Sequence, residues 1–213
     1  MESNIVEKHV RAILIHGFQS SPKVFRKIKH RLKSMGVVVH TIKYNSDKGY
    51  GTWIKSIDKK LKEVNAEDIY VIGHSLGGSL ALYLSKRYRF KGVIAINSPI
   101  YVRRHFPIKL MVKILSRFKR FEKITIRNIE YSLESVVSLF DFLNKFRITR
   151  INSLNSALII QSEKDKVVNA KSAKILYRNI NSDNKQLVKI GFGHTPLNQP
   201  DVIKSVIGFM GLV

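Results

Sequence analysis

Short apolar segments rich in valine and isoleucine alternate along this chain with segments whose apolar residues recur at helical spacing. The apolar runs predict buried β-strands, and the helical spacing predicts amphipathic helices that cover them. The expected strands are residues 10–15, 37–44, 69–72, 93–96, 157–160 and 186–190, and the expected helices are residues 22–34, 52–64, 79–88, 170–177 and 201–210. This alternation predicts an α/β fold with a mostly parallel sheet of about six strands, flanked by helices, in a single domain over residues 1–213.

The segment after the third expected strand carries the most specific motif of the chain. Residues 73–77 read GHSLG, and an expected helix follows them. A G-x-S-x-G sequence between a strand and a helix places the serine hydroxyl, here that of Ser75, on a sharp turn above the edge of the sheet. Gly73 and Gly77 lie where a Cβ atom would collide as strand and helix close together. The turn also directs the Leu76 N–H toward the space beside the Ser75 hydroxyl, where an oxyanion would form.

A serine hydroxyl needs a neighbouring base before it can attack a substrate at neutral pH. If the base follows Ser75 with an acid between them, the candidates among the seven histidines are His105 and His194. His105 follows two arginines, whose positive charge would disfavour a proton on its ring. His194 lies in a glycine-containing loop after the last expected strand, from which its side chain can reach the sheet edge. His194 is therefore the predicted base.

Two further parts of the site can be placed from the expected strands. Glu163 and Asp165 are the acids between the serine and the histidine that lie just beyond a strand. Asp165 is the predicted partner of the imidazole because its shorter side chain is more easily fixed, and Glu163 is the alternative. A second oxyanion donor should come from the loop after the first strand, where Gly17 permits a sharp turn and the Phe18 N–H can point inward.

These segments together resemble the α/β-hydrolase fold, in particular compact bacterial carboxylesterases and monoacylglycerol-lipase-like enzymes. The resemblance covers nearly the whole chain and rests on residues 16–18, 73–78, 163–168 and 193–194. It implies that Ser75 is the nucleophile, His194 the base and Asp165 the residue that orients the base. It also implies that the N–H groups of Phe18 and Leu76 form the oxyanion hole and that the substrate is a small acyl ester. A thioester or an amide stays open, because the same three residues serve all three reactions.

Residues 101–150 lie between the fourth and fifth expected strands, where this family usually inserts a cap. They contain 12 Lys or Arg and four Asp or Glu, a net charge of +8. A helix starting at Ile108 would place apolar residues on one face and basic residues on another. We predict a helical cap or lid whose apolar face covers the site. Its basic face suggests a weak contact with anionic lipid or polymer.

Other classes of site are disfavoured by what the sequence lacks. The absence of cysteine excludes a thiolate nucleophile and cysteine-ligated metals. The phosphate-loop, zinc-protease and dinucleotide motifs are absent, so we expect neither a metal nor an organic cofactor. There is no apolar run long enough for a membrane span and no leader pattern at the N-terminus, which predicts a cytoplasmic protein.

The charge balance supports a second hypothesis. The chain has 38 Lys and Arg against 15 Asp and Glu, a net charge of +23. Such a balance favours polyanionic partners, so the alternative is a polyanion- or membrane-binding protein on a hydrolase scaffold. Fold alone does not fix function. A loss of catalysis is nevertheless disfavoured, because every predicted catalytic position carries a residue that can perform its role. Specific binding of nucleic acid is not predicted.

Overall fold

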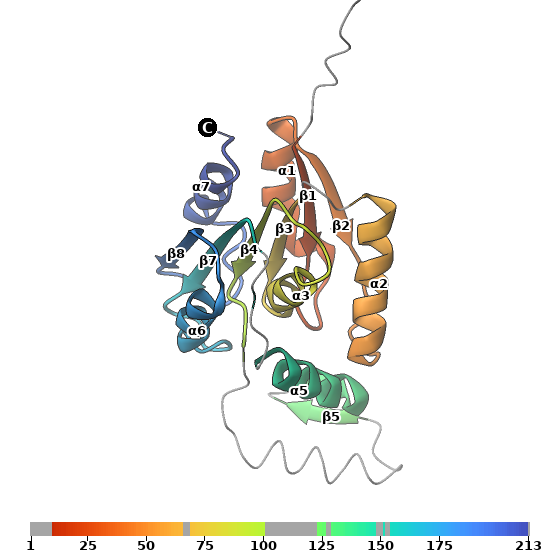
Figure 1. Cartoon of the computed structure of the whole chain (residues 1–213). Helices are drawn as coiled ribbons and strands as arrows, with labels where there is room; N and C mark the ends of the chain where they lie inside the picture. The colour runs from red at the N-terminus through yellow and green to blue at the C-terminus, as the bar shows by residue number, and fades with distance from the viewer. Residues whose placement is uncertain are drawn as a thin grey trace, which may run out of the picture.

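The computed structural model describes residues 10–65, 69–100, 123–126, 129–147, 151 and 154–212. A six-stranded, fully parallel sheet runs through the molecule in the order β2-β1-β3-β4-β7-β8 (Figure 1). Its strands are β1 (Arg11–Ile15), β2 (Val38–Ile42), β3 (Ile69–His74), β4 (Gly92–Ile96), β7 (Ser156–Ser162) and β8 (Asn184–Ile190). The predicted α/β class and mostly parallel sheet are confirmed.

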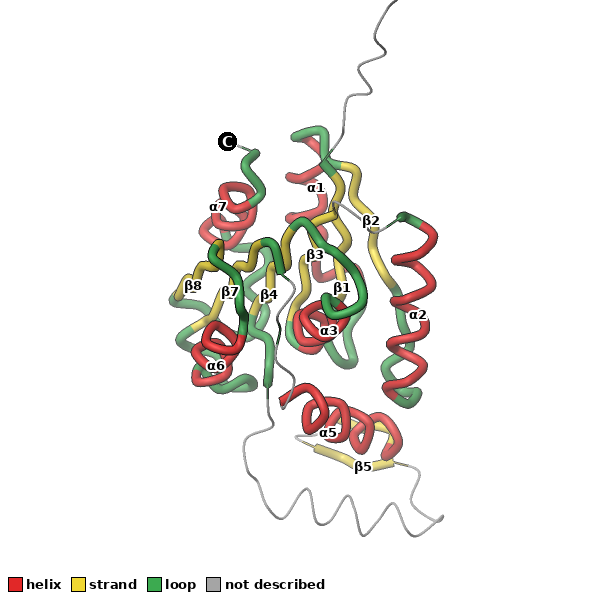
Figure 2. Tube along the Cα trace, viewed as in Figure 1, coloured by secondary structure: helices red, strands yellow, loops and turns green. Residues whose placement is uncertain are grey.

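Helices cover both faces of the sheet and bury two separate cores (Figure 2). Alternate β1 residues point to opposite faces, so that Ile13 joins one core and Leu14 the other. The first core is closed by α2 (Tyr50–Glu63), α3 (Leu76–Leu84) and α6 (Lys171–Asn179). The second is closed by η1 (Pro22–Phe25), α1 (Arg26–Ser34) and α7 (Pro200–Phe209). Burial on both faces explains why the four inner strands, β1, β3, β4 and β7, contain continuous apolar runs.

The segment between β4 and β7 is only partly helical where the structure describes it. Strands β5 (Lys123–Ile126) and β6 (Ile129–Ser132) pair in antiparallel register, and α5 (Leu133–Arg147) follows. The predicted insertion thus contains a helix, α5, together with a hairpin that was not predicted from the sequence. Isoleucine or tyrosine at positions 124, 126, 129 and 131 alternates with polar residues, a period-two pattern that indicates a hairpin. The predicted basic helix from Ile108 and the alternative base His105 lie outside the described residues.

Contacts from two directions hold α5 and the hairpin against the domain. Figure 1 shows α5 beyond one end of the sheet, next to α2 and α3. Phe142 is fully buried, and its ring packs against those of Tyr50 and Tyr83 at centroid distances of 6.2 and 5.6 Å. At the end of β6, the Ser132 hydroxyl donates to the Asp47 carbonyl oxygen (3.1 Å). Among the helices of the described residues, none is long and apolar enough to cross a bilayer.

The strand order fixes where the functional loops meet. The chain passes from β1 to β2 on one side and then returns to place β3 on the other side of β1. The helices that follow β1 and β3, α1 and α3, therefore lie on opposite faces of the sheet, and such a switch point is where open α/β sheets bind ligands. Residues 16–19 follow β1 and Ser75 follows β3, so both lie at this point.

Candidate active site

Ser75 forms a tight turn between β3 and α3. Its backbone has φ 53° and ψ −126°, a conformation that L-residues seldom adopt. Hydrogen bonds fix this turn on both sides: the Ser75 N–H donates to the Ile96 carbonyl oxygen (2.8 Å) and the Gly78 N–H to the Ser75 carbonyl oxygen (3.0 Å). Helix α3 begins at Leu76, three residues earlier than expected. Its positive N-terminal end therefore lies directly beside Ser75.

The three glycines assigned to turns lie where backbones approach most closely. A Cβ atom at Gly77 would overlap carbonyl oxygens at the end of β1, and one at Gly73 would overlap the backbone of the first turn of α3. A Cβ atom at Gly17 would come within 3.0 Å of the Ser75 Cβ. The loops after β1 and β3 thus touch at Ser75, and the absence of side chains at these positions permits that contact.

Ser75, His194 and Asp165 come from three separate loops and form one hydrogen-bonded chain. The His194 Nε2 lies 3.1 Å from the Ser75 Oγ, and the His194 Nδ1 lies 2.8 Å from the Asp165 Oδ2. An ionised carboxylate only accepts hydrogen bonds, so Nδ1 carries the proton that donates to Asp165. Nε2 is then free to accept the Ser75 hydroxyl proton, which is the arrangement a general base requires.

Asp165 is held as an anion. Burial raises the pKa of its carboxyl group, but the hydrogen bond from His194 and those from the N–H groups of Val167 (2.7 Å) and Val168 (2.9 Å) outweigh burial and leave the pKa below its usual value. Glu163, the alternative acid, is exposed, and its carboxylate lies 3.5 Å from the Lys189 ammonium group. Of the two acids, Asp165 is the one that contacts His194.

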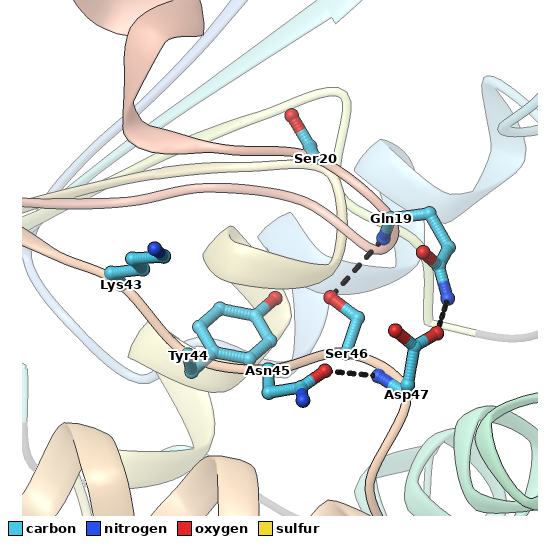
Figure 3. Close-up of a pocket in the computed structure, with 7 residues that line it drawn as sticks. All are labelled: Gln19, Ser20, Lys43, Tyr44, Asn45, Ser46 and Asp47. Carbon is cyan, nitrogen blue, oxygen red and sulfur yellow. Dashed lines mark hydrogen bonds between the residues drawn. The ribbon is translucent and has the colours of Figure 1, made fainter.

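The loop after β1 is fixed by polar contacts with the segment after β2. The Tyr44 hydroxyl donates to the His16 carbonyl oxygen (3.0 Å), and the two rings stack at a centroid distance of 4.4 Å. Gln19 has a φ of 50°; its N–H donates to the Ser46 hydroxyl (3.2 Å) and its side-chain amide to the Asp47 carboxylate (2.7 Å) (Figure 3). These groups border a polar pocket of about 390 Å³.

Phe18 and Leu76, the predicted oxyanion donors, follow β1 and Ser75 respectively. Neither main-chain N–H donates a hydrogen bond to another residue in the ranges that the structure covers. The Phe18 side chain packs on the first core, with its ring 6.0 Å from that of Trp53. Within the described residues, both N–H groups thus lack a protein acceptor.

Sequence reasoning missed two residues that contact the main chain of His194. His74 is buried, and its Nε2 donates to the His194 carbonyl oxygen (2.9 Å). Burial lowers the pKa of His74 to about 4, so the ring is neutral at physiological pH. The fully buried Asn97 donates from Nδ2 to the same carbonyl oxygen (2.8 Å). Asn97 directly follows the expected strand of residues 93–96, and a polar residue at the end of a strand is the feature of the sequence that could have indicated a role in the site.

The sequence pattern of an uncharacterised protein family, UPF0227, matches residues 11–210. The chain belongs to the UPF0227 family. Among curated proteins, this UPF0227 chain is similar to a carboxylesterase of Bacillus subtilis (strain 168), with 24% identity over 199 residues, 82% of this chain and 80% of the relative. It is also similar to a thermostable monoacylglycerol lipase of Bacillus sp. (strain H-257), with 25% identity over 207 residues, 85% of this chain and 80% of the relative.

Solved structures give the same fold for this UPF0227 member. The monoacylglycerol lipase of Paleococcus ferrophilus aligns with a TM-score of 0.80 and 16% identity, covering 95% of each chain. Est1E from Butyrivibrio proteoclasticus, determined with bound ferulic acid, aligns with a TM-score of 0.68 and 18% identity, covering 99% of this chain and 91% of Est1E. The predicted resemblance to α/β-hydrolases is confirmed.

Proposed function

We propose that this protein is a serine hydrolase that cleaves carboxylic esters through an acyl-enzyme intermediate. The observation that carries the proposal is the hydrogen-bonded chain from the Ser75 hydroxyl through His194 to Asp165. Ser75 Oγ attacks the acyl carbon while His194 Nε2 takes its proton, and His194 then returns that proton to the departing alcohol. A water molecule, deprotonated by His194, attacks the acyl-enzyme and releases the acid together with free Ser75.

The oxyanion of each tetrahedral intermediate would accept hydrogen bonds from the Phe18 and Leu76 N–H groups. Each donor of this kind contributes about 3 kcal/mol of transition-state stabilisation. The hydrogen bonds of Gln19 to Ser46 and Asp47 support this role, since they hold the loop that carries Phe18. The start of α3 at Leu76 adds the positive end of a helix dipole. This chemistry requires neither a metal ion nor an organic cofactor.

The names of the two bacillar relatives, a carboxylesterase and a monoacylglycerol lipase, support an ester of a carboxylic acid as the substrate. An apolar acyl group is also supported by the insertion, because the Tyr131 ring of β6 stacks on the Phe18 ring at a centroid distance of 5.9 Å. We propose that residues 101–150 act as a cap that covers this side of the site. Contact of the basic segment within them with anionic lipid or polymer stays a prediction from sequence.

The test is hydrolysis of p-nitrophenyl esters of increasing acyl length, beginning with the acetate. We expect a burst of p-nitrophenol followed by steady turnover, and in quenched samples an acyl group on the peptide that contains Ser75. The preferred acyl length would report the size of the covered pocket. No release above background at any length would refute the ester proposal. Matched thioester and anilide substrates would then identify the bond that is cleaved instead.

Asp165→Asn is expected to lower kcat for the preferred ester by about 10⁴-fold. An asparagine side chain can donate to His194 Nδ1, which favours the tautomer that carries its proton on Nε2. In that tautomer, Nε2 cannot accept the Ser75 hydroxyl proton. Steady-state kinetics of the folded variant would measure the loss. Glu163→Gln is the matched control, because Glu163 is exposed and directed to Lys189, and it should keep kcat within a factor of about two.

The same pair of variants also gives a prediction for the pH dependence of stability. The pKa of Asp165 is lowered in the folded state, so its ionisation stabilises the fold above its unfolded pKa of about 3.9, and this stabilisation is lost as the pH falls further. Between neutral pH and strongly acidic pH, Asp165→Asn should therefore lose less unfolding free energy than Glu163→Gln. An equal loss in urea titrations of the two variants would contradict the assignment of Asp165 as the stabilised anion.

A further inference from the structure

The main-chain carbonyl oxygen of His194 accepts hydrogen bonds from two buried side chains, those of Asn97 and His74. Asn97 Nδ2 donates to this oxygen at 2.8 Å and His74 Nε2 at 2.9 Å. Asn97 Nδ2 also lies 3.2 Å from the Gly193 carbonyl oxygen. We propose that Asn97 is a positioning residue, which sets the distance between His194 and Ser75 by holding the main chain of residues 193–194. The proposal rests on the proposed function, since it assigns His194 as the base.

Asn97 is itself fixed to two strands of the sheet. Its N–H donates to the Ile160 carbonyl oxygen of β7 (2.8 Å), and its side-chain oxygen accepts the Ser162 N–H (2.7 Å) at the end of that strand. Its Nδ2 additionally lies 2.9 Å from the Ser162 hydroxyl. The residue adopts φ 48°, a region that asparagine occupies more readily than most other L-residues. Asn97 therefore cannot shift without moving the ends of β4 and β7.

The glycines of the loop that carries His194 add no side-chain packing. Gly191 and Gly193 are exposed, and a Cβ atom at either would meet nothing within 4 Å. Phe192 packs against the second core, and Leu197, three residues beyond His194, is buried within it. Between these two apolar anchors, the hydrogen bonds to the Gly193 and His194 carbonyl oxygens are the polar contacts that hold the main chain.

The same residue links the acid to the base. Asp165 follows β7 by three residues, and its N–H donates to the Ser162 carbonyl oxygen (3.3 Å). The Asn97 amide binds Ser162 through its oxygen and His194 through its nitrogen. The amide can do this because its oxygen accepts from an N–H group while its NH₂ group donates to a carbonyl oxygen. A carboxylate would place a second acceptor against two carbonyl oxygens, and these would repel it.

Asn97→Asp is expected to lower kcat about 10²-fold with KM changed by less than about threefold, because a displacement of the base by about 1 Å has an effect of this size and leaves ground-state binding intact. Asn97→Gly, which keeps the positive φ but removes the amide, should show the same split. The control is Asn155→Asp. It removes a comparable amide bond, to the Phe90 carbonyl oxygen (3.1 Å), at the far end of β7 and should keep the wild-type kcat.

A second measurement does not depend on the choice of substrate. The rate at which a fluorophosphonate labels Ser75, followed by intact mass, requires activation of the hydroxyl by His194 but no ester turnover. Labelling should be slowed about 10²-fold in both Asn97 variants and unchanged in Asn155→Asp. Wild-type labelling at the rate of the Asn97 variants would overturn the positioning role. Rapid wild-type labelling without hydrolysis of any ester would refute the ester proposal alone. A wild-type protein that is not labelled would refute both.

Discussion

Ser75→Ala is expected to reduce kcat for ester hydrolysis by about 10⁶-fold, to the level that substrate binding and the oxyanion donors alone can supply. The change removes the proposed nucleophile, the Ser75 Oγ, which lies 3.1 Å from the His194 Nε2 in the wild-type protein. The proposed base then has no hydroxyl group to deprotonate. The turn itself should survive. Its fixing hydrogen bonds come from main-chain atoms, and alanine has the same steric demand as serine at φ 53°.

The experiment compares kcat for Ser75→Ala with that for Ser205→Ala on the preferred p-nitrophenyl ester. Ser205 lies on α7, and its hydroxyl donates to the Asp201 carbonyl oxygen (2.8 Å), far from the loops that follow β1 and β3. Ser205→Ala should keep wild-type activity. Thermal unfolding would show that both variants are folded. Turnover in Ser75→Ala within tenfold of the wild-type value would mean that another group performs the chemistry, whatever the geometry at Ser75.

Local sequence patterns were sufficient to predict the strands of the sheet and the tight turn at Ser75. Apolar segments identified the six strands, and this signature is clearest in β1, β3, β4 and β7, which are buried on both faces. The residues around Ser75 were recognisable because one short segment contains the whole turn, including the glycines that the close approach of β1 demands. Asp165 and His194 could be proposed because each follows a predicted strand, so that the topology of a parallel sheet places both at the same edge.

The contacts that local patterns missed join distant positions. Asn97 and His74 reach the His194 carbonyl oxygen across 97 and 120 residues, and nothing in the residues next to them indicates that partner. The start of α3 at Leu76 was placed too late for a related reason. Two glycines open the helix, and their low intrinsic helix propensity is overridden because the tertiary contact tolerates no larger residue. The β5–β6 hairpin differs from these contacts, because its alternating apolar and polar residues are visible in the local sequence.

Gly77→Ala is expected to lower the free energy of unfolding by at least about 3 kcal/mol, and a protein that does not fold would agree with this. Gly77 lies in the first turn of α3, where alanine would ordinarily gain about 1 kcal/mol of helix propensity. Here the added Cβ would overlap the carbonyl oxygens of Ile15 and His16. These are backbone atoms of a central strand and its loop, and β1 is paired with β2 and β3 on its two sides.

Gly208→Ala is the control that separates the gain in helix propensity from the steric overlap of the added Cβ. Gly208 lies in α7, is exposed, and has nothing within 4 Å of the position a Cβ would take. This variant should gain about 0.5–1 kcal/mol, which is the propensity effect alone. Urea unfolding of both variants, followed by circular dichroism, would measure the difference. A Gly77→Ala protein as stable as wild type would show that α3 can move away from β1, and the Leu76 N–H would then have no fixed place beside Ser75. The proposed oxyanion site and the stability of the fold therefore depend on the same contact between Gly77 and the end of β1.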